Sequence, residues 1–171
     1  MFVDLDEFPR KKTPLLSQYR LQYHIGVLSS YVLDTDVIVA ALRSSTGASR
    51  QLLLAALHHQ FALLLSVPLF LEYEAVLTRP EQLAACGLNR AEVGKVLDDL
   101  AVVARPVRLA FRWRPQMPDP DDDMVLETAI NGGASAIVTF NLRHLSNVCD
   151  AFRCAVLLPA AALHQIRRSV P

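Results

Sequence analysis

The chain has 171 residues, carries 17 basic and 17 acidic residues, and is 52% hydrophobic. This length and apolar content suit one domain with a single core and disfavour two domains. The neutral balance excludes a global positive field, so any binding of nucleic acid must come from a local patch. The longest apolar region, residues 52–71, is broken by polar residues and a proline before it reaches the roughly 20 residues that span a bilayer. No membrane-spanning helix is therefore predicted.

Residues 1–29 have mixed charge, two prolines and no sustained periodicity. We expect them to form a peripheral arm outside a domain of residues 30–168. The arm begins with acids and prolines, whereas an export signal begins with a basic stretch and an apolar run. A cytoplasmic protein is therefore expected. Its three cysteines, Cys86, Cys149 and Cys154, lack CxxC spacing and are expected to be reduced.

The elements predicted after the arm alternate between strands and helices. A buried first strand is expected at residues 31–33, and its apolar run is extended by residues 37–42 after an acidic interruption. The following elements are a helix over 48–59, a strand over 61–66, helices over 68–79 and 90–103, a strand within 102–109 and a loop over 111–117. An acidic helix then ends at Gly132-Gly133, and strands over 134–140 and 155–158 precede a closing helix over 160–168. This alternation predicts a mostly parallel sheet covered on both faces.

Four aspartates open the acidic helix within five residues, at positions 119, 121, 122 and 123. Helix capping and the helix dipole account for two or three of them. A fourth adds like-charge repulsion of roughly 1 kcal/mol per close pair in water. A bound cation is the alternative explanation for the cluster, and this segment alone leaves both explanations open.

Two further segments offer acids near the ends of predicted elements. Asp34 and Asp36 follow the first strand, although an exposed turn would also explain them, and Glu72 and Glu74 flank the inner face of the 68–79 helix. Helical geometry does not decide between the two glutamates. Parallel sheets bring such positions to one edge, and carboxylates without clustered His or Cys favour Mg²⁺ or Mn²⁺. The chemistry that fits is metal-assisted hydrolysis of a phosphodiester.

Three stretches together resemble a known family: YVLDTDVIVAALRS, SVPLFLEYEAVLTRP and DPDDDMVLETAINGGASAIVTFNLRHL. Over residues 31–166 the chain resembles a PIN domain, specifically the ribonuclease toxins of type II toxin-antitoxin modules of the virulence-associated-protein C type. The resemblance implies a Rossmann-like three-layer α/β/α sandwich and a Mg²⁺- or Mn²⁺-dependent endoribonuclease. It also implies an RNA substrate, a cognate antitoxin protein and a homodimer.

Matched residue by residue, the resemblance implies that Asp34, Glu72 and Asp122 are the catalytic, metal-binding acids, and the choice between the two glutamates falls on Glu72. The other three aspartates of the cluster become capping or outer-shell groups. At a fourth catalytic position this chain has Asn141 where many PIN domains carry Asp. An asparagine still offers a carbonyl oxygen but removes one negative charge, so one metal ion or two remains open. Asp36 returns some of that charge.

Arginines near the acidic motifs are candidates for binding RNA phosphates: Arg43, Arg50 and Arg143, with Arg79 beside them. Each of them is also explained as an ordinary surface residue. Phosphate contacts would position the RNA strand without giving a sequence preference.

Two alternatives to the nuclease are open. Leu33-Asp34-Thr35-Asp36 also resembles the nucleophile motif of haloacid dehalogenase phosphatases, but that chemistry needs a well-placed lysine, and only Lys95 lies beyond residue 12. The second alternative is a PIN-like module with a weakened site that binds RNA or a protein partner. Asn141 is the residue that supports it.

Overall fold

The computed structural model describes residues 29–110, 120–142, 145, 152 and 154–169, with the side chains of residues 120–122 and 169 outside the description. The described strands are β1 (Ser30–Leu33), β2 (Ala62–Ser66), β3 (Arg105–Val107), β4 (Ala136–Val138) and β5 (Ala155–Leu157). The described helices are α1 (Thr35–Arg43), α2 (Ala48–Leu57), α3 (Val67–Leu77), α4 (Pro80–Cys86), α5 (Arg90–Val103), α6 (Pro120–Gly132) and α8 (Pro159–Ser169).

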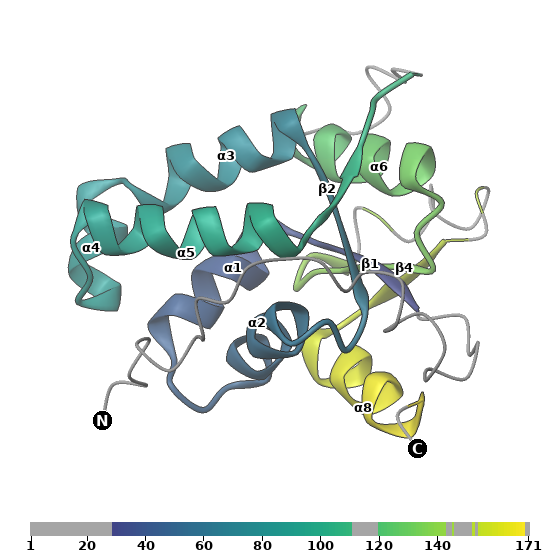
Figure 1. Cartoon of the computed structure of the whole chain (residues 1–171), viewed down its shortest axis with the longest axis horizontal. Helices are drawn as coiled ribbons and strands as arrows, with labels where there is room; N and C mark the ends of the chain where they lie inside the picture. The colour runs from purple at the N-terminus through teal and green to yellow at the C-terminus, as the bar shows by residue number, and fades with distance from the viewer. Residues whose placement is uncertain (1–28, 111–119, 143–144, 146–151, 153, 170–171) are drawn as a thin grey trace, which may run out of the picture.

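The five described strands form one parallel sheet in the order β3-β2-β1-β4-β5. Helix α6 lies on one side of this sheet, and α2 and α8 lie on the other (Figure 1). The predicted three-layer α/β/α sandwich is therefore confirmed. The chain moves outward from β1 through β2 to β3 and then crosses back to β4 and β5. This reversal makes the boundary between β1 and β4 the topological switch point, where open α/β sheets bind their ligands.

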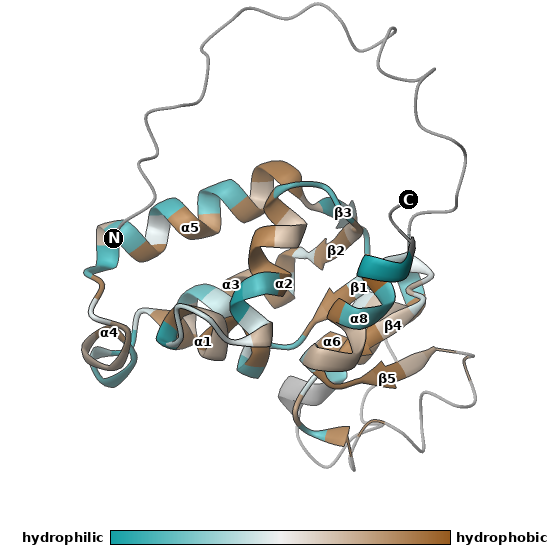
Figure 2. Cartoon of the chain, turned by 90° about the horizontal axis from the view of Figure 1, so that it is seen from below, coloured by the Kyte–Doolittle hydropathy of each residue, from teal (hydrophilic) through white to brown (hydrophobic). Residues whose placement is uncertain are grey.

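The core is built from the central strands, which are coloured hydrophobic along their length in Figure 2, and from one face of each covering helix. Tyr31 of β1 packs against Phe61, with ring centroids 5.3 Å apart. The Tyr31 hydroxyl donates a 3.1 Å hydrogen bond to the Gln165 side chain, which ties β1 to α8. A buried sheet covered on both faces explains why its strands are continuous apolar runs.

Local signals set several helix ends. Asn89 and Glu92 form a reciprocal capping box at the start of α5, with hydrogen bonds of 3.0 and 2.8 Å. The Ser66 hydroxyl accepts the Leu69 amide at the start of α3. Helix α6 ends before Gly133, which has a φ of 63° that a side chain would strain. The predicted helix end at the glycine pair is confirmed.

Gly132 allows α6 to approach the sheet closely. A Cβ at this position would lie 2.8 Å from Leu64 Cδ1 on β2 and 2.8 Å from Val107 Cγ2 on β3. Carbon atoms in contact normally lie about 3.5 to 4.0 Å apart. The absence of a side chain at Gly132 therefore sets the distance between the C-terminal end of α6 and these two strands.

The structure corrects one sequence prediction. Residues 37–42 do not extend the first strand but belong to α1, because Val37, Ile38, Ala41 and Leu42 bury one helical face against the core. Helix α4 begins at Pro80, which occupies the first helical turn, where its missing amide hydrogen costs no hydrogen bond. The predicted short strand within residues 102–109 is confirmed as β3, and residues 102 and 103 before it belong to α5.

Some predictions concern residues outside the description, including the arm up to residue 28, the loop at 111–117 and Cys149. Cys86 and Cys154, the two cysteines within the described residues, are both free thiols. Among the described helices, none is both long enough and apolar enough to span a membrane.

Candidate active site

The site lies where β1 and β4 end side by side. Leu33 of β1 pairs with Val138 of β4, so the next residue of each strand, Asp34 and Thr139, leaves the sheet at the same point. The Asp34 amide donates a 2.9 Å hydrogen bond to the Val138 carbonyl. This places two polar side chains from segments 105 residues apart at the switch point of the sheet.

Asp34 is a buried carboxylate, with only 8% of its surface exposed. It occupies the N-cap position of α1, yet its side chain makes no capping hydrogen bond to that helix, whose residues are all described. Instead, its Oδ2 accepts a 2.7 Å hydrogen bond from the Thr139 hydroxyl. The positive end of the α1 dipole favours the negative charge at this position. The carboxylate is thus held toward β4.

Asp36 fastens the loop after β4 to the first turn of α1. Its Oδ2 accepts the Phe140 amide at 3.0 Å and lies 3.3 Å from the Thr139 hydroxyl oxygen. The Thr139 hydroxyl has one hydrogen, and it donates that hydrogen to Asp34, whose oxygen is the nearer acceptor. The Asn141 amide donates in turn to the Thr139 oxygen at 2.9 Å. The loop of residues 139–141 is therefore tied to both aspartates.

Tyr73 brings α3 to the end of β1. Its side chain is fully buried, and its hydroxyl donates a hydrogen bond to the Leu33 carbonyl, directly before Asp34. Burial, followed by the negative charges of Asp34 and Asp36, raises the pKa of Tyr73 well above its usual value near 10. The tyrosine therefore stays a neutral donor. Glu72, its neighbour in sequence, is half-buried, whereas Glu74 is exposed.

A pair of hydroxyls joins α6 to the end of β2. Ser66 Oγ and Thr128 Oγ1 lie 2.7 Å apart, and both side chains are buried. The Thr128 hydroxyl donates to the Met124 carbonyl at 2.7 Å, so Ser66 must be the donor to Thr128. This contact fixes α6 against the strand that leads into α3.

The first turn of α6 presents an acid to the interior. Asp123 is 2% exposed and Glu127, one turn later on the same face, is 1% exposed. The capping or outer-shell role that the resemblance implies for Asp123 stays a prediction. Burial of Asp123 shows that it faces inward. The side chain of Asp122 lies outside the description, so its position stays a prediction.

The donor atoms around the switch point suit a hard divalent cation. Asp34 and Asp36 bring carboxylate oxygens to this point, which are ligands of the type that Mg²⁺ and Mn²⁺ prefer, whereas the place of Glu72 in such a site stays a prediction. In the described part of the chain, no three Asp, Glu, His or Cys side chains form a group that could hold a metal ion. The side chain of the predicted ligand Asp122, in the first turn of α6, lies outside that part of the chain.

The predicted RNA-binding arginines occupy different surroundings. Arg43 is exposed in the last turn of α1, and its Nη2 donates a 2.7 Å hydrogen bond to the Gln82 side chain. Arg50 is half-buried on α2, and Arg79 is exposed at the start of α4. Arg143 lies outside the described residues. Of the three arginines that the structure describes, Arg43 is the one that shares a groove with Asp36.

Sequence reasoning did not assign site roles to Thr139, Phe140 or Tyr73. Their contacts to residues 33–36 arise from the pairing of β1 with β4 and from the packing of α3. An apolar strand followed by Thr was the local signal for Thr139. Only knowledge of the strand order would have turned that signal into a partner for Asp34.

A parallel α/β fold with carboxylates at its switch point defines a Rossmann-like protein, and the carboxyl edge of the sheet is where such folds bind their ligands. A model of the PIN domain family matches residues 30–143, well over half of the chain, and the chain belongs to that family. PIN domains are generally metal-dependent nucleases. The match favours a nuclease over the phosphatase alternative. A search of curated proteins finds no match to the chain.

Proposed function

We propose that this protein is a Mg²⁺- or Mn²⁺-dependent endoribonuclease that hydrolyses phosphodiester bonds in RNA. The observation that carries the proposal is the cluster of Asp34, Thr139 and Asp36 at the switch point of a PIN domain. Two carboxylates within reach of one hydroxyl create negative potential, which a divalent cation offsets.

Each described residue has a separate part in this proposal. Asp34 and Glu72 hold the cation together with an acid from the first turn of α6. Thr139 keeps the Asp34 carboxylate oriented, and Asp36 holds the loop that carries Thr139 and Asn141. A bound divalent ion supplies an activated water and offsets the charge of the phosphate. Asn141 would offer a neutral oxygen as a further ligand.

The acid from α6 is Asp122 in this proposal. The burial of Asp123 makes it the direct competitor, because adjacent helical residues point about 100° apart and only one of them can face the site fully. Separate Asp122→Asn and Asp123→Asn variants distinguish the two. The ligand's variant should lose cleavage and metal binding together, whereas the other should retain both.

The test is cleavage of a labelled single-stranded RNA in Mg²⁺, in Mn²⁺ and in EDTA. The wild type should cleave with either ion and stop in EDTA, and Asp34→Asn should lower the rate at least about 100-fold because a metal ligand is lost. Asp98→Asn, which removes an exposed acid on α5, is the matched control and should cleave normally. Cleavage that persists in EDTA would contradict the proposal.

The non-enzymatic module remains the second candidate because Asn141 lacks the charge of an aspartate. It would retain RNA with or without metal and cleave nothing. Asn141→Asp then serves as a diagnostic, since restoring the charge strengthens metal binding in a weakened site. A wild type that is inactive while Asn141→Asp cleaves RNA would favour this candidate.

We further propose that the nuclease is the cytoplasmic toxin of a toxin-antitoxin pair, acts as a homodimer and is neutralised by a cognate antitoxin. The support is the resemblance of its three motif stretches to toxins of the virulence-associated-protein C type. Induced expression of the wild type in bacteria should arrest growth, and Asp34→Asn should not. Normal growth with abundant active wild-type enzyme would refute the toxin role.

A further inference from the structure

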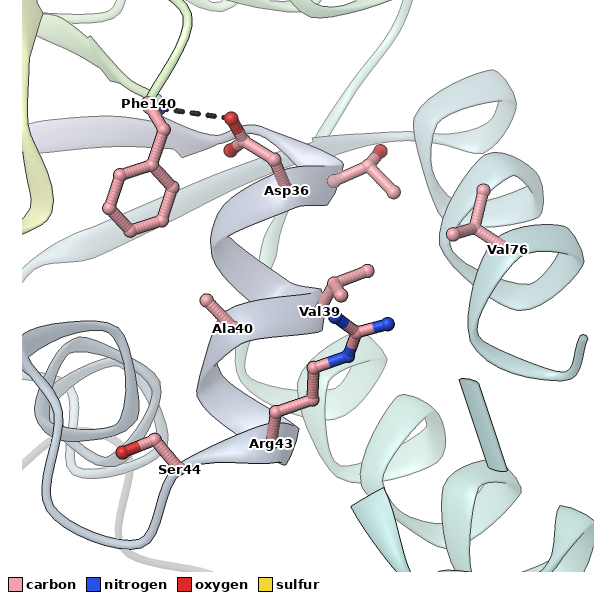
Figure 3. A pocket seen from close by; sticks show the side chains of 8 residues that line it. Asp36, Val39, Ala40, Arg43, Ser44, Val76 and Phe140 are labelled. Carbon is pink, nitrogen blue, oxygen red and sulfur yellow. Dashed lines mark hydrogen bonds between the residues drawn. The ribbon is translucent and has the colours of Figure 1, made fainter. Parts of the chain in front are cut away.

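An open groove of about 590 Å³ runs from the acidic cluster along α1. Val39 and Ala40 of α1 and Val76 of α3 contribute apolar surface, as Figure 3 shows. Asp36 and Phe140 stand at one end, and Arg43 stands two helical turns further along α1. The volume falls within the roughly 300 to 1,000 Å³ typical of sites for small organic groups.

Phe140 is an exposed aromatic residue that lines this groove. It follows β4 directly, and 52% of its surface is exposed. Its amide is held by Asp36 at 3.0 Å, and its ring points along α1 toward Ala40 (Figure 3). An aromatic ring that is both exposed and anchored through its backbone offers a preformed flat apolar surface. Burying that surface against a ligand is favourable.

The charges at the two ends complement a nucleic acid strand. The acidic end is where the proposed function places a phosphate through a divalent ion. At the other end, Arg43 is exposed, and its guanidinium is oriented by a 2.7 Å hydrogen bond to the Gln82 side chain. Asp36 and Arg43 are seven residues apart, which corresponds to about 10 Å along the helix axis. A strand lying in the groove would pass from the acids, across the ring, to a fixed cation.

We infer that Phe140 is a stacking platform for one unpaired base of single-stranded RNA next to the scissile phosphate, with Arg43 holding a neighbouring phosphate. The inference rests on the proposed function for the identity of the nucleic acid. Aromatic rings beside basic side chains are the usual way of binding unpaired bases. Phe140 is therefore a binding and positioning residue, and no chemistry is assigned to it.

Two other occupants would fit an apolar groove: a peptide side chain of a protein partner and a second copy of this chain. A peptide would be favoured by apolar surface alone. The single aromatic ring placed between an acidic end and a separate fixed arginine favours a ligand with alternating flat and anionic groups. The unpaired base is the occupant that uses both features.

The test measures binding of two probes to Asp34→Asn protein in Mg²⁺, so that the RNA is not consumed. One probe is a labelled 12-nucleotide oligo(A), and the other is a strand of the same length and backbone without bases. Phe140→Ala should weaken oligo(A) binding by about 5- to 150-fold and change abasic-strand binding by less than about 2-fold. Phe140→Trp should retain binding. Phe140→Leu, which keeps apolar volume without a ring, should behave like the alanine variant.

Arg43→Ala should weaken both probes and lower the dependence of affinity on salt by about one ion. Val102→Ala, which trims another exposed apolar side chain on α5, should bind both probes like the parent. Equal effects of Phe140→Ala on the two probes, full binding by Phe140→Leu, or no binding of oligo(A) at all would overturn the inference. Loss of a dimer in Phe140→Ala with unchanged RNA binding would assign the groove to a second copy and would also overturn it.

The cleavage assay of the wild type tests the proposed nuclease activity separately from the role of Phe140. Base-dependent binding through Phe140 without any cleavage would refute the proposed nuclease activity and would support Phe140 as a stacking platform. Metal-dependent cleavage with a Phe140→Ala rate and affinity equal to the wild type would leave the nuclease standing and remove the platform.

Discussion

Tyr73→Phe removes one hydroxyl group from the interior beside the proposed active site. Tyr73 is fully buried, and its hydroxyl donates to the Leu33 carbonyl. Loss of the donor leaves a buried acceptor without this hydrogen bond, which costs about 1 to 2 kcal/mol of the free energy of unfolding at neutral pH. For a chain of this size, each kcal/mol lowers Tm by about 2 to 4 °C. The ring remains, so no cavity larger than the hydroxyl is created.

The same variant has a characteristic dependence on pH. The folded-state pKa of Tyr73 is raised, so above about pH 10 the unfolded chain loses this proton while the folded protein keeps it. Ionisation of the tyrosine then lowers the free energy of the unfolded state. The contribution of Tyr73 to stability falls by about 1.4 kcal/mol per pH unit until the folded-state pKa is reached. Below about pH 9 the contribution is fully present. The phenylalanine variant lacks this dependence.

The assay is urea-induced unfolding of both proteins, followed by circular dichroism at pH 8, 9, 10 and 11. The advantage of the wild type over Tyr73→Phe should be constant at pH 8 and 9 and should shrink by about 1.4 kcal/mol by pH 11. Subtracting the variant removes the titration of lysines and other tyrosines. A difference that stays constant up to pH 11 would refute the reasoning, because Tyr73 would then titrate alike in both states.

Two further predictions concern the seating of α6. Gly132→Ala should lower the free energy of unfolding by about 1 to 3 kcal/mol in urea, because its Cβ would lie 2.8 Å from methyl carbons on β2 and β3. Gly94→Ala on α5, whose Cβ would meet no described atom within 4 Å, should instead stabilise by about 0.5 to 1 kcal/mol, and the same sign for both would contradict this account. Ser66→Ala and Thr128→Val, combined in a double-mutant cycle of urea unfolding, should show a coupling of about 0.5 to 1.5 kcal/mol. Each variant removes the same 2.7 Å hydrogen bond, because the two hydroxyls are partners of each other. Additive effects would mean that the contact does not join the two elements.

Local patterns were sufficient to predict most elements of this fold. The glycine pair at residues 132 and 133 marks a helix end by backbone chemistry that involves only neighbouring residues. The apolar runs of the strands predict burial on both faces. The prediction that residues 37–42 extend the first strand was wrong because it relied on local pattern alone. A short apolar run fits a strand and a buried helix equally well.

The sequence by itself also determined which residues carry charge near the ends of buried elements, and hence that Asp34 and the acids of α6 needed an explanation. Only the tertiary structure decided their partners. The hydrogen-bond register of β1 with β4 sets Thr139 beside Asp34 and Phe140 beside Asp36, and the seating of α6 turns Asp123 inward. Such contacts join residues about a hundred positions apart, and the backbone groups that pair strands are the same in every residue except proline. The choice of neighbouring strand therefore depends on the packing of the whole domain, which no short stretch of sequence contains.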